Sequence, residues 1–411
     1  MYYFLFEDYA VENFLPLVHF RAVHELRSGC STLGERIFSH FPHTPWGIIC
    51  RSAVRPFLQK ESESFSGIKP SKELLFVNSR VIMTRELASI IQKEKGEKII
   101  FVCDGNVAAA KFHFHEKASS SKKQSASRNK SQFPDATEVK VDAKFFLYPW
   151  EIIHYNHQAI EDDFKRLTKR KPQKIAGVHF INSASISVGK NCTMKPGVVL
   201  DAEKGSIVIG NNVTIMPNAV IIGPAFLGNN SLIKVGAKIY GGTSIGEWCK
   251  IGGEVEASVI QSYSNKQHDG FLGHSFLGSW VNLGADTNTS DLKNNYSNVR
   301  VQIGKKEIDS GSQFVGSIIG DHSKTGINVM LNTGTVIGIS SNIFGADFSP
   351  KVVGNFSWGN GNTFQPYDIE KAIETARVVM QRRNVEMSDA YEKRMRQIFL
   401  ETTRNKKNRG Q

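Results

Sequence analysis

The sequence has few cysteines and no long apolar stretch. Its five cysteines are an odd number among 411 residues, and none forms the CxxC spacing of zinc and redox sites. We therefore expect a reducing compartment, the cytoplasm, and no zinc site. No run of about 18 uncharged apolar residues occurs, which excludes a membrane-spanning helix. The apolar opening, residues 1–20, includes Glu7, Asp8 and Glu12 but neither a basic leader nor a cleavage site, so it predicts a strand and a turn rather than a signal peptide.

The remaining composition is that of a globular protein. Hydrophobic residues form 40% and aromatic residues 10% of the chain, which suits two or three domains and argues against a disordered or fibrous protein. Lys and Arg number 51 against 39 Asp and Glu, which gives a formal net charge of +12. That charge suits a protein that binds a polyanion, but it also suits an enzyme whose substrates carry phosphate groups.

Residues 1–170 alternate short apolar strands with helical segments, a pattern that predicts an α/β domain with a largely parallel sheet. Strands are expected at residues 2–6, 46–50, 74–78 and 98–103, and helices at 84–96 and within 149–171. Residues 117–135 are rich in Ser and Lys and nearly free of apolar side chains, which predicts a disordered insertion. We interpret its basic character as that of a solvated loop rather than a nucleic-acid site.

A repeat of six residues dominates the middle of the chain. An aliphatic side chain recurs at every sixth position, and a smaller one follows four positions after each, from Val213 to Cys249. The aliphatic positions are Ile209, Ile215, Ile221, Leu227, Ile233, Ile239, Ile245 and Ile251. Neither a helix nor an ordinary strand has this period, whereas a three-sided parallel β-helix needs one large inward side chain for each six-residue side. The same ladder recurs in segments before and after this run, which predicts a β-helix over residues 175–350.

Two breaks interrupt the repeat, at residues 254–270 and 288–317. Stacking alone does not require such connections, and we expect them to be binding elements. After the β-helix, residues 365–411 predict a helical extension with helices at 368–383 and 388–403.

Residues 266–287 and 318–338 resemble the family of bifunctional glucosamine-1-phosphate acetyltransferases and N-acetylglucosamine-1-phosphate uridyltransferases. The resemblance is closest to the alternate, Bacteroidetes-type branch, in which the runs SNKxHDGFLG, NLGADTNxSxLKNNY and GDHSKxGIN stand nearly as they do here. It implies an α/β nucleotidyltransferase-like domain, then a left-handed parallel β-helix of hexapeptide repeats and a short helical tail. It also implies a homotrimer that binds acyl-coenzyme A between adjacent prisms.

The resemblance places an acyl-transfer site on the β-helix. His268 matches the family's catalytic histidine, and an imidazole with a pKa of about 6.5 suits a general base for a sugar amine; the alternative is a histidine that satisfies a loop hydrogen bond. Lys266 matches a basic position that would neutralise a sugar phosphate, and Asn282 matches a sugar-binding asparagine. Ala285 matches the alanine whose backbone faces coenzyme A, and Gly345 matches a later alanine.

A polar cluster follows on the second break, at Asp291, Lys293, Asn294 and Asn295. Such a cluster suits a site for sugar hydroxyls and a phosphate, although an ordinary turn is the alternative. Asp291 falls at the position of the family's second sugar-contacting asparagine, and Ile327 falls at that of a cofactor-contacting serine. These departures leave acetyl-CoA open as the acyl donor.

The usual nucleotidyltransferase motif LxxGxGTRM, whose glycines let backbone N–H groups approach a triphosphate, is absent. In its place residues 14–36 resemble the pattern of the alternate branch, and the residues that fit it are Arg21, Arg27, Gly29 and Thr32. Arginine forks suit polyphosphate oxygens. The alternative is that the two arginines are ordinary surface charges.

Nucleotidyl transfer normally uses Mg²⁺ held by a carboxylate after a central strand. This chain has Asn78 and Arg80 at that strand end. Three alternatives are open: Arg80 supplies the positive charge, another acid such as Asp8 or Asp104 binds the metal, or catalysis has been lost. The metal ligands are therefore not identified by the sequence, and Asn156 is a further expected nucleotide or sugar contact.

The leading hypothesis is a sugar-1-phosphate nucleotidyltransferase that joins UTP or dTTP to a sugar 1-phosphate. Its β-helix would bind or acylate an amino-sugar phosphate, in nucleotide-sugar biosynthesis for the cell envelope. The alternatives are a hexapeptide acyltransferase with a scaffold N-terminal domain, and a non-catalytic sugar-nucleotide-binding protein. We expect neither a nucleic-acid partner nor membrane insertion.

Overall fold

The computed structural model describes residues 1–41, 46–57, 73–113, 135–361 and 363–407. The insertion predicted at 117–135 therefore lies outside the described residues, except for Asp135. The chain forms two compact units. Unit 1 consists of Met1–Phe14, Phe20–Leu26 and Thr32–Tyr148, and unit 2 consists of Leu15–His19, Arg27–Ser31 and Pro149–Gln411.

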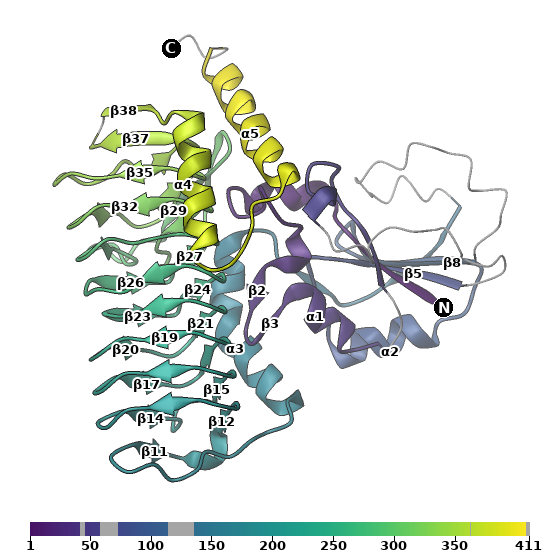
Figure 1. Ribbon diagram of the computed structural model, residues 1–411. Helices are drawn as coiled ribbons and strands as arrows, with labels where there is room; N and C mark the ends of the chain where they lie inside the picture. The colour runs from purple at the N-terminus through teal and green to yellow at the C-terminus, as the bar shows by residue number, and fades with distance from the viewer. Residues whose placement is uncertain (42–45, 58–72, 114–134, 362, 408–411) are drawn as a thin grey trace. The chain divides into compact units, whose positions relative to one another are not determined.

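Unit 1 is built on a six-stranded sheet with the order β4-β1-β5-β8-β7-β9 (Figure 1). The strands are β1 Tyr2–Phe6, β4 Trp46–Ile49, β5 Glu73–Asn78, β7 Lys98–Cys103, β8 Asn106–His113 and β9 Thr137–Lys140. The four predicted strands are confirmed. The pairs β1–β4, β1–β5 and β7–β9 are parallel, while β8, which the sequence pattern did not reveal, runs antiparallel to both of its neighbours.

Both faces of this sheet are buried. The helices are α1 Leu33–Phe38 and α2 Arg85–Lys93, the second of which confirms the helix predicted at 84–96. Leu5 and Leu75 pack in one cluster with side chains of both helices. Phe4 and Phe76 lie in a second cluster, with ring centroids 5.0 Å apart. Shorter elements in the first 148 residues are η1 Tyr9–Phe14, η2 Val23–Glu25, β2 Arg27–Ser28, β3 Ser31–Thr32, η3 Arg55–Phe57, β6 Val81–Ile82 and β10 Lys144–Phe145.

Unit 2 is a three-sided parallel β-helix whose coils stack strand upon strand (Figure 1). Face 1 holds β11 His179–Ile181, β14 Val199–Asp201, β17 Val220–Ile222, β20 Lys238–Ile239, β23 Glu254–Glu256 and β26 Phe271–Gly273, and the pair β28 Asn288–Thr289 and β33 Met330–Leu331 follows in the later coils. Face 2 holds β12 Ile186–Val188, β15 Ile207–Ile209, β18 Ala225–Leu227, β21 Thr243–Ile245, β24 Val259–Ile260, β27 Phe276–Leu277, β31 Ile318–Ile319, β34 Val336–Ile337 and β36 Val352–Val353. Face 3 holds β13 Thr193–Met194, β16 Thr214–Ile215, β19 Leu232–Ile233, β22 Lys250–Ile251 and β25 Asn265–Lys266, then β32 Lys324–Thr325, β35 Asn342–Ile343, β37 Ser357–Asn360 and β38 Thr363–Pro366.

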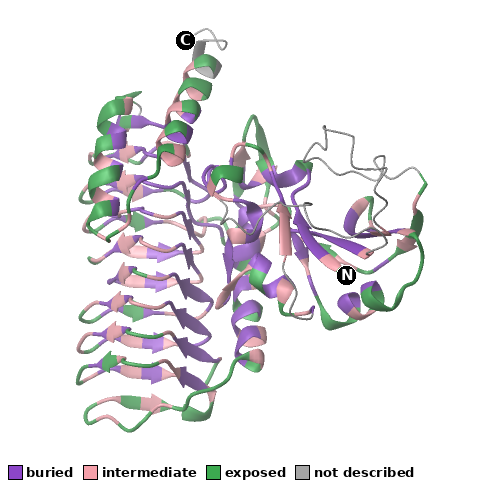
Figure 2. Ribbon diagram, turned by 45° about the vertical axis from the view of Figure 1, so that its right-hand side comes forward, coloured by how far each residue is buried: buried purple, intermediate pink, exposed green. Residues whose placement is uncertain are grey.

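The predicted aliphatic ladder is confirmed as the core of the β-helix. All eight positions from Ile209 to Ile251 are at most 2% exposed and belong to one cluster. Figure 2 accordingly shows buried residues in the strands of every part of the β-helix stack except its first coils. The smaller side chains are buried beside them. Ser231 shows how a hydroxyl is accommodated there, because its Oγ donates to Gly246 O at 2.8 Å and accepts from Cys249 N at 3.2 Å.

The prediction that residues 254–270 interrupt the β-helix is wrong. Strands β23, β24 and β25 all pair in register with the coil before them. The coil is shortened instead: Leu227 and Ile245 pair at a spacing of 18 residues, whereas Ile245 and Ile260 pair at 15. The sequence pattern loses its period here although the stacking continues.

The second predicted break does leave the coil. Its centre folds as an antiparallel hairpin of β29 Arg300–Ile303 and β30 Lys306–Asp309. The helices of unit 2 are α3 Pro149–Arg166, α4 Ile369–Gln381 and α5 Asp389–Lys407, with the 3-10 helix η6 Ser183–Ser185, and they confirm the helices predicted near 149–171, 368–383 and 388–403. Ile160 and Phe164 of α3 pack on Val208 and Phe226 of face 2. No helix in the described ranges is both long enough and apolar enough to cross a bilayer.

Because the ladder residues form the core, we expect Ile233→Ala to lower the free energy of unfolding by about 2 to 5 kcal/mol. Val235→Ala is the matched control, since Val235 is 58% exposed two residues away. Urea denaturation followed by circular dichroism measures both variants. Equal midpoints for the two would contradict the stacked aliphatic core.

Candidate functional sites

The predicted nucleotide-site residues of unit 1 include a buried polar cluster at the ends of two neighbouring strands. Asp8 follows β1 and Asn78 ends β5, and both side chains are at most 4% exposed. Asn78 Nδ2 donates to Asp8 Oδ2 at 2.8 Å, and Arg80 Nε donates to Asp8 Oδ1 at 2.8 Å. Arg80 Nη2 forms an ion pair with Asp8, and its Nη1 donates to Phe146 O at 2.7 Å. The positive charge of Arg80 is thus neutralised by Asp8.

This cluster does not fit Mg²⁺. Hard cations need carboxylate oxygens as ligands, but Asp8 Oδ1 also accepts from Ala10 N at 3.1 Å, so both of its oxygens are already engaged. Asp104, the other acid considered, is an exposed residue of the turn between β7 and β8. No group of three or more His, Cys, Asp or Glu suited to a metal occurs in the described ranges.

Two further predicted nucleotide contacts, Arg21 and Thr32, lie in unit 1. Arg21 O accepts a hydrogen bond from Arg51 Nη2 at 3.0 Å, which fixes the backbone at this position. Thr32 begins α1 as its N-cap: its Oγ1 accepts from Glu35 N at 3.2 Å, and Glu35 Oε2 accepts from Thr32 N at 2.7 Å. Such a reciprocal capping box satisfies two backbone donors at the start of a helix.

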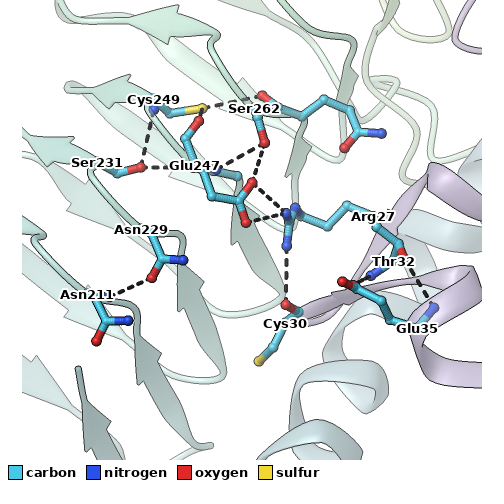
Figure 3. A network of polar contacts seen from close by, with 12 residues as sticks. Arg27, Cys30, Thr32, Glu35, Asn211, Asn229, Ser231, Glu247, Cys249 and Ser262 are labelled. Carbon is cyan, nitrogen blue, oxygen red and sulfur yellow. Dashed lines mark hydrogen bonds and ion pairs between the residues drawn. The ribbon is translucent and has the colours of Figure 1, made fainter. Parts of the chain in front are cut away.

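Arg27 belongs to unit 2, where it is buried against the β-helix (Figure 3). Its Nη2 donates to both carboxylate oxygens of Glu247, at 2.9 and 3.0 Å, and its Nη1 donates to Cys30 O at 3.2 Å. Burial alone would raise the pKa of Glu247, but the charge of Arg27 and the hydroxyl of Ser262 outweigh it and lower that pKa. The guanidinium also lies over the ring of Phe226, 5.1 Å from its centroid. These contacts are structural, and a contact of Arg27 with nucleotide stays a prediction.

Gly29 and Asn156 meet in the same part of unit 2. Gly29 N donates to Asn156 Oδ1 at 2.6 Å, and Asn156 Nδ2 donates to Gly242 O at 2.7 Å and to Ser244 Oγ at 3.0 Å. Gly29 has a φ of +72°, a backbone conformation that favours glycine. The residues expected to form one nucleotide site are therefore divided between the two units.

On the β-helix, three predicted acyl-transfer residues share the edge between face 3 and face 1. Stacked turns form this edge: Asp286 N donates to Asp269 O at 3.0 Å, which joins the turn of Ala285 to the turn that follows His268. Gly345 lies in the turn after β35, with a φ of +100°. His268 itself is exposed. The fold thus places these residues along one edge, on different coils.

Lys266 occupies an inward position of face 3. It pairs in register with Ile251 and is only 1% exposed, so it takes the place of an aliphatic side chain. Its Nζ donates to His268 O at 2.8 Å and to Gly252 O at 3.2 Å. Burial lowers the pKa of Lys266 to about 8, against the opposing effect of three nearby carboxylates. The ammonium thus holds the turn of His268 from inside, and its contact with a sugar phosphate stays a prediction.

Asn282 lies on face 3, where it bridges Asn265 of the coil before it and Lys324 of the coil after it. Arg383, just after α4, donates from Nη2 to Asn265 Oδ1 at 3.1 Å. Burial lowers the pKa of Lys324 to about 8, and its Nζ donates to His322 O at 2.8 Å. Asn282 therefore faces the α4 side of the β-helix.

The predicted cluster at 291–295 divides into a pair and a turn. Asp291 Oδ2 accepts from His274 Nδ1 at 2.7 Å. Lys293 Nζ donates to a backbone carbonyl five residues ahead at 2.5 Å, and Asn295 Oδ1 accepts from Ser297 N at 3.1 Å, as in an ordinary turn. Asn294 is exposed in that turn. The sequence analysis missed His274, and no spacing rule would have found it, because its partner lies 17 residues later in another coil.

Comparison with known proteins relates the N-terminal region to a family. Residues 3–172 match the family model described as sugar nucleotidyl transferase. This region of the chain is therefore similar to that family. The bifunctional protein GlmU of Synechococcus elongatus is 31% identical to it over 211 residues, which are 46% of this chain and 43% of that protein. A bifunctional sugar-1-phosphate nucleotidylyltransferase/acetyltransferase of Sulfurisphaera tokodaii is 36% identical over 118 residues, 28% of each chain.

The chain spans less than half the length of the curated relatives that it matches. Among solved structures, a UDP-N-acetylglucosamine acyltransferase of Arabidopsis has 13% identity and a TM-score of 0.23, covering 52% of this chain and 78% of that one. The S84T mutant of AntD, an N-acyltransferase from Bacillus cereus, has 14% identity and a TM-score of 0.23, covering 53% and 100%. These structural similarities are too distant to bear on function.

The buried Lys266 predicts a pH-dependent stability difference. Its folded pKa of about 8 lies below that of a lysine in the unfolded chain, so the unfolded state binds more protons between these two values. The free energy of unfolding of the unmodified chain, relative to Lys266→Met, should therefore rise from pH 8 to pH 10, by at most about 1.4 kcal/mol per pH unit. Urea titrations across this range measure the difference. Lys190→Met, at an exposed lysine, is the control, and a constant difference for Lys266→Met would contradict the shift.

The contact between Arg27 and Glu247 predicts strong coupling in a double-mutant cycle. Arg27→Met and Glu247→Gln should together destabilise the protein by less than the sum of the single changes, with a coupling energy of about 1 to 3 kcal/mol at neutral pH. Because the folded pKa of Glu247 is lowered, this coupling is present above the carboxyl's ordinary pKa and is lost as the pH falls through the folded value. The control cycle is Arg300 with Glu307, a pair 3.3 Å apart whose side chains are 61% and 52% exposed. Equal coupling in the two cycles would contradict the prediction.

Proposed function

We propose that this chain is a sugar-1-phosphate nucleotidyltransferase whose β-helix transfers an acyl group to an amino-sugar phosphate, in nucleotide-sugar synthesis for the cell envelope. The family match over residues 3–172, followed in the same chain by a hexapeptide β-helix, is the observation that carries the proposal. The Sulfurisphaera relative is named for the same two activities in one protein, which supports the proposal.

In the first reaction a phosphate oxygen of the sugar 1-phosphate attacks the α-phosphorus of the nucleoside triphosphate. A new P–O bond forms and pyrophosphate leaves. UTP and dTTP are the substrates expected from the resemblance. The protein must stabilise the negative charge of the phosphates, for which arginine is suited. Arg21, which lies in unit 1 with the family's sheet, is our first choice for this role. Mg²⁺, when bound, would supply further charge stabilisation.

In the second reaction the amine of the sugar attacks the carbonyl carbon of an acyl thioester, and acetyl-CoA is the proposed donor. The face 3 to face 1 edge supports this choice, because Ala285 and Gly345 lie in its turns and are partly exposed. The amine must lose a proton to a base, for which an imidazole is suited. The resemblance implies that His268 is this base.

A second candidate function is favoured by one observation in unit 1. Both oxygens of Asp8 are engaged, and Arg80 is neutralised by it, so this strand edge holds neither a vacant carboxylate nor an unpaired arginine. An acyltransferase whose N-terminal domain serves as a docking scaffold would have this property. Pyrophosphate release separates the two functions.

We also propose that the chain acts in the cytoplasm as a homotrimer. All five cysteines are free, as expected for a reducing compartment. Exposed apolar side chains lie in turns of the β-helix, at Val235 and Ile327, and would suit an interface between copies. Sedimentation equilibrium should give a mass near three chains, and a monomer at all concentrations would contradict the assembly.

The nucleotidyl half is tested by pyrophosphate release from UTP or dTTP with a panel of sugar 1-phosphates. We expect Arg21→Ala to lower kcat/KM by about 10-fold or more, because a charge-assisted hydrogen bond to phosphate is lost. Arg85→Ala, at an exposed arginine of α2, is the matched control and should have no effect. No release by the unmodified chain with any substrate would favour the scaffold candidate instead.

A further inference from the structure

Four cationic side chains gather where α4 ends beside face 3. Lys250 begins β22, Lys234 directly follows β19 on the coil before it, and Arg382 and Arg383 directly follow α4. After burial, the charges of Arg383, Arg382 and Lys234 are what lower the pKa of Lys250, and no carboxylate opposes them. Within the described residues none of the four side chains forms an ion pair. Such a group of like charges costs electrostatic free energy unless an anion binds to it.

One hydrogen bond holds this cluster in place on the outer side of face 3. Lys250 and Asn265 pair in register on neighbouring coils, and each precedes an inward residue, so both point outward. Arg383 Nη2 donates to Asn265 Oδ1 at 3.1 Å. Among the described residues Lys250 Nζ has no hydrogen-bond partner. The ammonium and the other N–H groups of the guanidinium are therefore available to an anion.

The cluster lies next to the turn of His268. Gly252 and Gly253 follow Lys250 in the same coil, and they contact the coils on either side. A Cβ at Gly253 would lie 2.7 Å from His268 O, and a Cβ at Gly252 would lie 3.1 Å from Cβ of Lys234. Lys234 and His268 therefore belong to the coils directly before and after that of Lys250.

Carboxylates lie on the other side of His268. Asp269 directly follows it, and Asp286 of the next coil donates from its backbone N to Asp269 O at 3.0 Å; both aspartates are exposed. The chain passes through this turn from β25 on face 3 to β26 on face 1. Positive charge thus lies on the face 3 side of the imidazole and negative charge on the face 1 side. A small molecule with an amine and a phosphate would be oriented by this separation of charge.

The amino-sugar acceptor matches this separation better than the acyl donor does. In a 2-amino sugar 1-phosphate the amine and the phosphate are attached to neighbouring ring carbons. In coenzyme A the whole pantetheine arm separates the thioester from the nearest phosphate. Lys266, which the resemblance assigns to the sugar phosphate, instead directs its Nζ inside the coil to two backbone carbonyls. The phosphate therefore needs cations from outside the coil.

We propose that Lys250 and Arg383, with Lys234 and Arg382 beside them, bind the phosphate of the amino-sugar acceptor and so hold its amine at His268, an inference that rests on the proposed function. Arg383 donates to the phosphate oxygens through the N–H groups that Asn265 leaves unengaged, and Lys250 adds a second positive charge. The proton of the amine still goes to His268.

The test measures KM of full-chain variants in thiol release from acetyl-CoA, with glucosamine 1-phosphate or glucosamine as the acceptor. Lys250→Gln and Arg383→Gln should each raise KM for glucosamine 1-phosphate by about 10-fold or more, because a charge-assisted hydrogen bond is lost. Neither should change KM for glucosamine, which has no phosphate. Lys371→Gln is the matched control, since it removes an exposed charge from the first turn of α4, and it should change neither value.

Two further measurements separate binding from catalysis and from folding. Calorimetric titration with glucosamine 1-phosphate alone gives the affinity of each variant without acyl transfer, and thermal denaturation checks the fold. Lys250→Gln should bind more weakly without a lower melting temperature, because Lys250 makes no hydrogen bond or ion pair among the described residues and its removal relieves repulsion between cations. A merely structural lysine would lower the melting temperature and leave KM unchanged.

The outcomes distinguish this site from the proposed function. Continued acetyl transfer with unchanged KM and affinity in both variants would overturn the site and leave the proposed function standing. A raised KM for acetyl-CoA alone would assign the cluster to the donor and overturn the acceptor assignment. If the unmodified chain binds glucosamine 1-phosphate through Lys250 but transfers no acetyl group, the proposed function fails and the phosphate site is supported.

Discussion

The stacking of inward aliphatic side chains, coil upon coil, is the constraint on which the rest of unit 2 depends. Each coil must return its chain to the same three inward columns, so residues are added or removed where a coil turns and the columns stay in register. The long excursion between Leu277 and Ile319 obeys this rule, because these two residues still pair directly. Chemistry-bearing side chains are consequently confined to the edges and outer faces, and residues far apart in sequence, such as Ala285 and Gly345, come to lie along one edge.

The coil that carries His268 departs from this regularity in two ways at once. It is reached through the shortened repeat between Ile245 and Ile260, and its inward column contains Lys266 instead of an aliphatic residue. Burying the ammonium costs solvation free energy, and the lowered pKa of Lys266 reflects this cost. Two backbone carbonyl oxygens, one of them that of His268, accept hydrogen bonds from Nζ and partly offset it. At this inward position two directed hydrogen bonds replace the dispersion contacts of an aliphatic side chain, and one of them fixes the turn of His268 from inside.

The β-helix could be predicted from the sequence because its period is local and is repeated many times. The break at 254–270 was wrong for the same reason: a shorter coil changes the period without changing the stacking. The antiparallel strand β8 could not be predicted, because its run of small apolar residues, Ala108 to Ala110, lacks the alternation of apolar and polar residues that indicates a strand. Pairs of residues that are distant in sequence could not be predicted either. Examples are the pair of His274 with Asp291 and the salt bridge of Arg27 with Glu247. Neither sequence separation corresponds to the spacing of neighbours within one helix or one strand. The sequence indicated candidate site residues, but not the atoms that each of them contacts in the fold.

Arg27 illustrates how such contacts restrict a functional interpretation. Its Nη1 and Nη2 both donate within unit 2, and its Nε is buried without a partner among the described residues. A phosphate could bind this guanidinium fully only by displacing Glu247, which Ser262 also contacts, so binding there would have to overcome a network that belongs to the β-helix. Arg21 lies in unit 1, with the sheet that carries the family match. For the proposed nucleotidyl transfer, residues of unit 1 are therefore the better candidates for contacts with a triphosphate, while Arg27 keeps the segment from residue 27 to 31 attached to the stacked coils.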